Sequence, residues 1–88
     1  MGLGRVRLNS GSMQHAVTGA TLTGADLTGA TLILAHFSGA DLTGANLYNA
    51  TLNAADLKKA KGISQKQLDQ ACGNDRTELP PTLTIKWC

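Results

Sequence analysis

A large apolar residue recurs at every fifth position between residues 17 and 57, and an alanine stands two residues before almost every one. The large residues are Val17, Leu22, Leu27, Leu32, Phe37, Leu42, Leu47, Leu52 and Leu57. A period of five matches neither the 3.6 residues of a helical turn nor the two-residue alternation of a strand. Threonine and glycine between the apolar positions also argue against a continuous helix. The pattern therefore predicts a chain that turns a corner every five residues.

The five-residue blocks ADLTG at residues 25–29 and ANLYN at 45–49 show the pattern most clearly. Residues 15–63 resemble the pentapeptide-repeat family, whose pattern is roughly A-(D/N)-L-x-x. The resemblance implies an all-β solenoid: a short right-handed quadrilateral β-helix with a C-terminal α-helical cap. Each block would form one side of a square, with its first and third residues inward. Residues twenty apart would then stack, so that Val17, Phe37 and Leu57 share one inner column.

The C-terminal third predicts a cap for this short solenoid. Ser64 and Gln67 have the spacing of a capping box, which predicts a helix over residues 65–72. Its apolar stripe is Leu68, Ala71 and Cys72, and Gly73 follows where a left-handed residue ends a helix.

Beyond this helix, Pro80 and Pro81 predict an extended tail with alternating apolar residues. The chain thus divides into an N-terminal tail or cap at 1–14, the β-helix at 15–63, and a helix with extended tail at 64–88.

Composition and charge exclude some classes of partner. Only 16% of residues are charged, 3% are aromatic, and the net charge is +2. No apolar run reaches the ~18 residues that a membrane span needs, so we expect no membrane association. We also expect no nucleic-acid partner, because such binders usually carry a clustered basic face. The lysines at 58, 59, 61 and 66 are interpreted as a charged edge that prevents other chains from stacking, against the alternative of an anion or nucleic-acid contact.

No group of residues predicts catalysis. Asp26, Asp41 and Asp56 all take the second, outward position of a block, where the family resemblance implies a structural surface role. His36 stacks over Asp56, but no nucleophile accompanies this pair. The two histidines and two cysteines lack zinc-site spacing. We therefore expect no enzyme, no cofactor and no metal site.

Three outward positions carry large apolar side chains: Ile33, Leu34 and Tyr48. Two interpretations are open. The C-terminal tail, through Leu79, Leu83 or Ile85, covers these residues, or they form an interaction patch for a partner.

Cys72 and Cys88 are the only cysteines. A disulfide between them would close a loop of about 17 residues and contribute roughly 3 kcal/mol. The segment ACGNDRTELPP with a terminal cysteine also resembles the ending of small bacterial pentapeptide-repeat proteins, many of them exported. The alternative is a reduced, buried Cys72 and a frayed end. A disulfide would favour an exported or periplasmic protein whose leader was removed, and free thiols a cytoplasmic one.

These features predict a non-catalytic structural or protein-interaction module that presents a flat β-helix surface to a protein partner. It would be a monomer or a weak homo-oligomer. The alternative is a gyrase-interacting DNA mimic, an activity known for one branch of the family. The short length and positive net charge disfavour it, because that branch uses a long acidic rod.

Overall fold

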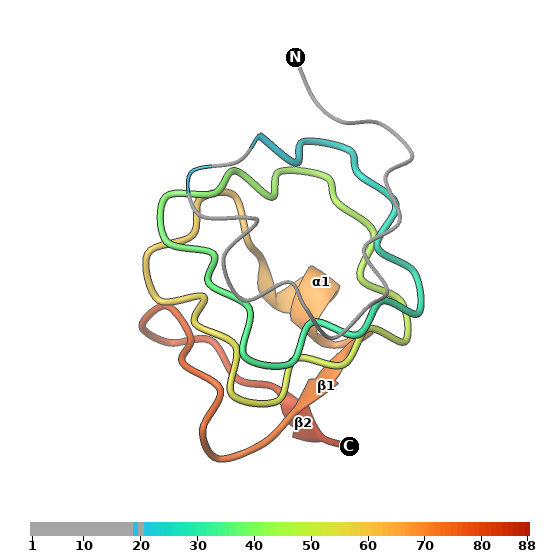
Figure 1. Cartoon of the computed structure of the whole chain (residues 1–88), viewed down its shortest axis with the longest axis vertical. Coiled ribbons are helices and arrows are strands. Elements are labelled where there is room, and N and C mark those ends of the chain that lie inside the picture. The colour runs from blue at the N-terminus through green and yellow to red at the C-terminus, as the bar shows by residue number, and fades with distance from the viewer. Residues whose placement is uncertain (1–18, 20) are drawn as a thin grey trace.

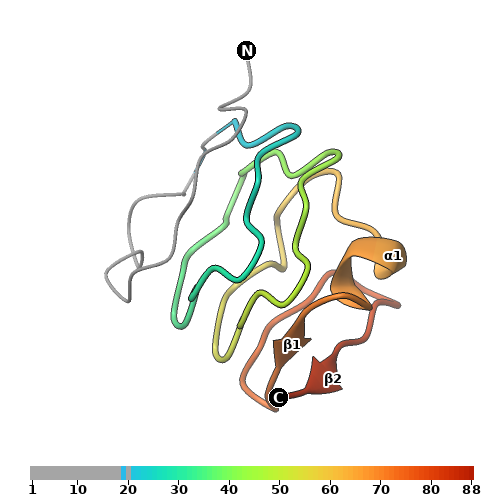
Figure 2. The ribbon, with the colours of Figure 1, turned by 90° about the vertical axis from the view of Figure 1, so that its right-hand side faces the viewer.

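The computed structural model of the chain describes residue 19 and residues 21–88. The chain winds around a closed ring, and successive turns of the ring lie one above another (Figures 1 and 2). Parallel backbone pairs join residues that are twenty apart. These pairs are Thr21 with Asp41, Asp26 with Asn46, Thr31 with Thr51, and His36 with Asp56. Each pair marks one side of the coil, in the order first to fourth, and the pairing has the register that the sequence predicts.

The corners of the coil follow from the last residues of each block. The N–H of Ala25 donates to the C=O of Leu22 at 2.9 Å, and Gly24 between them has a φ of 71°. A positive φ at this third turn position is the type II geometry, which glycine adopts without steric cost. A block ending in glycine therefore turns the chain once every five residues.

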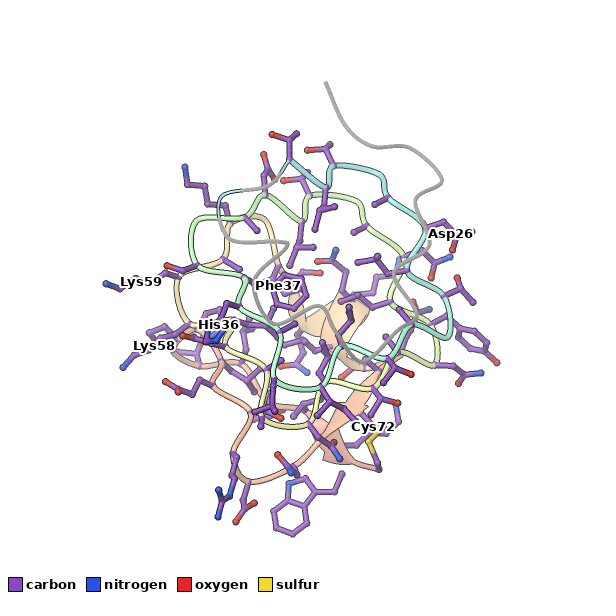
Figure 3. All side chains as sticks on the ribbon, viewed as in Figure 1. Asp26, His36, Phe37, Lys58, Lys59 and Cys72 are labelled. Carbon is purple, nitrogen blue, oxygen red and sulfur yellow. A yellow bond between two sulfur atoms is a disulfide. The ribbon has the colours of Figure 1, made fainter. Side chains whose placement is uncertain are left out.

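The core is the inside of the ring. Its buried residues are the inward alanines from Ala25 to Ala55 and the large apolar residues from Leu22 to Leu57, together with Leu68 and Ala71. Phe37 points into the ring (Figure 3). Val17 and the segment 1–14 lie outside the described residues. The buried positions are the ones that the five-residue period predicts.

The short helix α1, Gln65–Leu68, replaces the strand that would form the second side of the third coil. Ser64 caps it, and the predicted capping box is present. The predicted extent of residues 65–72 is wrong at its C-terminal end. Cys72 pairs with Thr51 instead of continuing the helix. Backbone pairing to the coil above therefore ends the helix early.

Cys72 and Gly73 form strand β1, which pairs in parallel with strand β2, Lys86–Trp87. The expectation that Gly73 ends a helix with a left-handed conformation is also wrong. A side-chain Cβ at this position would lie 2.6 Å from the Thr77 hydroxyl oxygen. Glycine is needed here because another segment approaches closely.

Coil-like pairing extends past residue 63 with a changed spacing. Thr51 pairs with Cys72, 21 residues on, and Asp56 pairs with Glu78, 22 residues on. The tail then turns at Pro80–Leu83, where the N–H of Leu83 donates to the C=O of Pro80, so the extended path predicted at the two prolines is interrupted. The half-buried Leu79, Leu83 and Ile85 pack against the core. The tail thus closes the C-terminal end of the ring (Figure 2).

Candidate interaction surface

Three large apolar side chains remain exposed on the coil. The exposed fractions are 37% for Ile33, 49% for Leu34 and 53% for Tyr48. Ile33 and Leu34 follow the third side of one coil, and Tyr48 precedes the third side of the next. We call these three residues the apolar patch. The interpretation in which the tail covers them is not what the structure shows, because the apolar tail residues pack against the floor of the core.

Leu34 has an unusual backbone for a large side chain. Its φ is 64°, at a corner position where five glycines have φ values of 69–74°. Asn49 and Ala54 take the same left-handed conformation at their corners, with φ values of 59° and 60°, but both have smaller side chains. A left-handed conformation costs a residue with a Cβ roughly 1–2 kcal/mol. Leu34 accepts this strain and is nevertheless about half exposed. Core packing therefore does not explain a leucine at this corner.

Replacement of a strand by α1 leaves an open groove on the second side. The groove has a volume of about 710 Å³ and lies between the segment around Asn46 and Tyr48 and the residues Ser64, Lys66 and Gln70. We call it the Tyr48 groove. Among the described residues, no backbone bridge joins the second side to the turn of chain below it. The other three sides pair onward to Lys61, Cys72 and Glu78. Sequence reasoning did not find this groove, because nothing in the five-residue pattern shows where a side will be missing.

Gln67 fills part of the missing side. Its side-chain amide nitrogen donates to the C=O of Leu42 at 2.8 Å and to the C=O of Ala45 at 3.0 Å. Its side-chain oxygen accepts from the N–H of Ser64 at 2.7 Å. On the other sides, a backbone N–H reaches the equivalent alanine carbonyl, as Lys61 does for Ala40 and Cys72 does for Ala50. The Gln67 amide thus takes the place of a strand backbone, and its side chain lines the groove.

The carboxylates of the coils brace the corners, the structural role that the sequence predicts. Asp26, Asp41 and Asp56 each accept a hydrogen bond from the backbone N–H two residues on, at 3.0–3.1 Å. Asn46 does the same for Tyr48. Donation by the Thr43 hydroxyl and N–H lowers the pKa of Asp41 below its ordinary 3.8, and the charge of Lys61 adds to this effect. These bonds hold the outward face of the coil in a fixed shape.

The comparisons with known proteins agree with this geometry. Residues 20–58 match the model of the pentapeptide repeats, in eight copies. These residues are a pentapeptide-repeat module. Pentapeptide repeats imply a β-helix, which accounts for the stacked coils. No curated protein matched the chain.

The lysines at 58, 59, 61 and 66 do not form one cluster. Lys58 and Lys59 lie on the opposite side of the ring from Asp26, which heads the second side (Figure 3). Lys66 belongs to α1 and lines the Tyr48 groove. His36 pairs with Asp56 through the backbone, so the two side chains lie in one column of the fourth side. The structure therefore separates a basic corner from a single lysine at the groove.

Cys72 and Cys88 form a disulfide in the structure, with the two sulfur atoms 1.97 Å apart. The bond joins β1 to the last residue of the chain, next to the pairing of β1 with β2. The N–H of Cys88 also donates to the C=O of Gly73. The end of the tail is thus covalently attached to the third side of the coil.

Residues 19 and 21–88 contain no group of three or more histidine, cysteine or acidic residues that could hold a metal ion. None of the helices among these residues is long and apolar enough to cross a membrane.

Proposed function

We propose that this chain is a non-catalytic protein-interaction module that docks a partner through the apolar patch of Ile33, Leu34 and Tyr48. We infer that its coils form the right-handed quadrilateral β-helix of the family, whose flat sides suit a protein surface. The conformation of Leu34 carries the proposal. Backbone strain at an exposed apolar residue indicates a functional constraint, because glycine would serve the fold at lower cost.

The patch has the composition of a small docking site. Two aliphatic side chains and a phenol are exposed beside a side of the coil that presents Thr31 and Thr51. Tyrosine is enriched at the centres of protein interfaces, where its ring is buried and its hydroxyl finds a partner. No observation favours the gyrase-directed alternative, since a net charge of +2 does not suit imitation of DNA.

Site-specific photo-crosslinking in an extract of the native host tests this proposal. A photoreactive residue at position 34 should yield an adduct of defined mass. The same residue at position 23, an exposed corner on another side, should not. The adduct at position 34 should disappear when Ile33 and Tyr48 are both changed to serine. Equal labelling at positions 34 and 23 would contradict the proposal.

A further inference from the structure

We propose that the Tyr48 groove binds an acidic, extended segment of a protein partner, with the carboxylate of that segment paired to Lys66. The inference rests on the proposed interaction role and specifies the chemistry of the partner beside the apolar patch. Tyr48 belongs to both features, so a partner that covers the patch reaches the groove directly.

The charge of the groove favours an anion. Lys66 is the only charged residue among those that line it, and no acidic side chain lines it. No described residue forms an ion pair or a hydrogen bond with the Lys66 amine. Asp26 lies one coil away from Asn46, and its Oδ1 accepts the N–H of Thr28. Asp69, three residues after Lys66, accepts a hydrogen bond from the side-chain amide of Gln65. A carboxylate in the groove would therefore meet an ammonium group that forms no ion pair with a described residue.

Some polar groups of the groove are hydrogen-bonded within the protein, and others are open to a ligand. Gln67 and the oxygen of Asn46 are engaged within the protein, by the bonds described above. The Tyr48 hydroxyl, the Gln70 amide and the Lys66 amine have no hydrogen-bond partner among the described residues. All three can donate, so the open side of the groove presents donors to an occupant that brings acceptors. A carboxylate and the peptide carbonyls beside it supply those acceptors.

A peptide fits these observations better than a nucleic acid. A nucleic-acid contact requires several cations along a phosphate backbone. The groove has one, and the basic corner of Lys58 and Lys59 lies across the ring from the column of Asp26 and Asn46 (Figure 3). A single lysine beside a phenol and the Gln70 amide matches one carboxylate on an otherwise uncharged segment.

The test is a titration followed by amide NMR. The probe is an acetylated and amidated glycine-rich peptide with one central glutamate, and its matched control replaces that glutamate with glutamine. The acidic peptide should shift the amide signals of residues 46–48 and 64–70 saturably, and the glutamine peptide should not. Lys66→Gln should weaken binding by about threefold, the factor expected for a partly exposed ion pair. Lys59→Gln, on the far side of the ring, should leave it unchanged.

Three outcomes would overturn the inference: signal changes centred on residues 58–61, equal weakening by Lys66→Gln and Lys59→Gln, or tighter binding of a short DNA duplex at the same residues. Lys66 is exposed and makes no contact on which folding depends, so the variant keeps the fold. Crosslinking at position 34 does not enter this measurement. An adduct there without peptide binding would remove the groove inference alone, and peptide binding without an adduct would remove the patch proposal alone.

Discussion

At the scale of single residues, a buried side chain and an exposed one can be direct neighbours in the sequence. Such neighbours offer a matched pair of variants. Leu32 is fully buried, and its neighbour Ile33 is 37% exposed. Leu32→Asp places an unpaired carboxylate in the core and should cost several kcal/mol of unfolding free energy. Ile33→Asp should cost less than about 1 kcal/mol. Urea unfolding followed by circular dichroism measures both, and equal losses would show that the inward register is wrong.

Leu34 provides the opposite case, a substitution that should stabilise the protein. Leu34→Gly relieves the left-handed strain, although glycine costs more backbone entropy. The net gain should be about 0.5–1 kcal/mol, or a rise in Tm of about 2–8 °C for a domain of this size. Differential scanning calorimetry measures it. Gly39→Leu, the reverse change at an equivalent corner with a φ of 74°, should lower Tm. A fall in Tm for Leu34→Gly would mean that the side chain serves the fold.

Asp41 predicts a pH effect. Hydrogen bonds from Thr43 lower its pKa in the folded state below 3.8, so folding favours the charged carboxylate. The resulting stability is complete above the unfolded pKa and is lost as the pH falls through the folded pKa. The melting temperature of the wild type should therefore decrease as the pH is lowered below about 4, and it should decrease less steeply in Asp41→Asn. Asn46 shows that an asparagine can accept the same backbone N–H. Asp75→Asn is the control, and an identical acid dependence for the Asp41 and Asp75 variants would contradict the assignment.

At the scale of elements, α1 depends on one side chain more than on its own length. A four-residue helix is too short to be stable alone, since isolated helices need about 12–15 residues. The Gln67 side chain makes two hydrogen bonds to the coil above and accepts a third from the N–H of Ser64 at the helix cap. Gln67→Ala should therefore lower the unfolding free energy by about 2–3 kcal/mol, at about 1 kcal/mol for each bond. Lys66→Ala, one residue away, should change it by less than about 0.5 kcal/mol. Guanidinium titrations compare the two, and a small effect of Gln67→Ala would show that packing of Leu68 holds the helix.

The sequence predicts the inward columns and the start of α1, because both depend on local spacing. The five-residue period places Leu22 to Leu57, and Ser64 with Gln67 marks the N-terminus of the helix. The end of the helix is not predicted, because Cys72 is drawn into pairing with Thr51. The groove and the acceptors of Gln67 are missed for the same reason. Their partners lie 22 and 25 residues away, and no local pattern records such contacts.

At the scale of the whole molecule, the disulfide keeps the C-terminal tail in place over the end of the coil. Cys72 and Cys88 are separated by 16 residues, and that segment contains the tail residues that pack against the core. Reduction should lower the unfolding free energy by about 3 kcal/mol in the chain-entropy model. Urea titrations with and without reductant measure the difference. The double variant Cys72→Ala/Cys88→Ala should reproduce the reduced protein and no longer respond to reductant. An unchanged midpoint on reduction would mean that the tail is held without the bond.

The change in pairing register around α1 has a consequence for how such a protein can change its length in evolution. Pairing advances by 20 residues above the helix, by 21 at Cys72 and by 22 at Glu78. The cap formed by the residues after Lys61 therefore matches particular sides of the coil above it, and only in one rotation about the axis of the coil. Duplication of a single block would rotate the cap by one side and separate Gln67 from Leu42 and Ala45. Duplication of a whole coil, such as residues 40–59, would return the cap to the same sides. Inherited changes in length are thus tolerated only as whole turns, which the cap accepts without a compensating substitution.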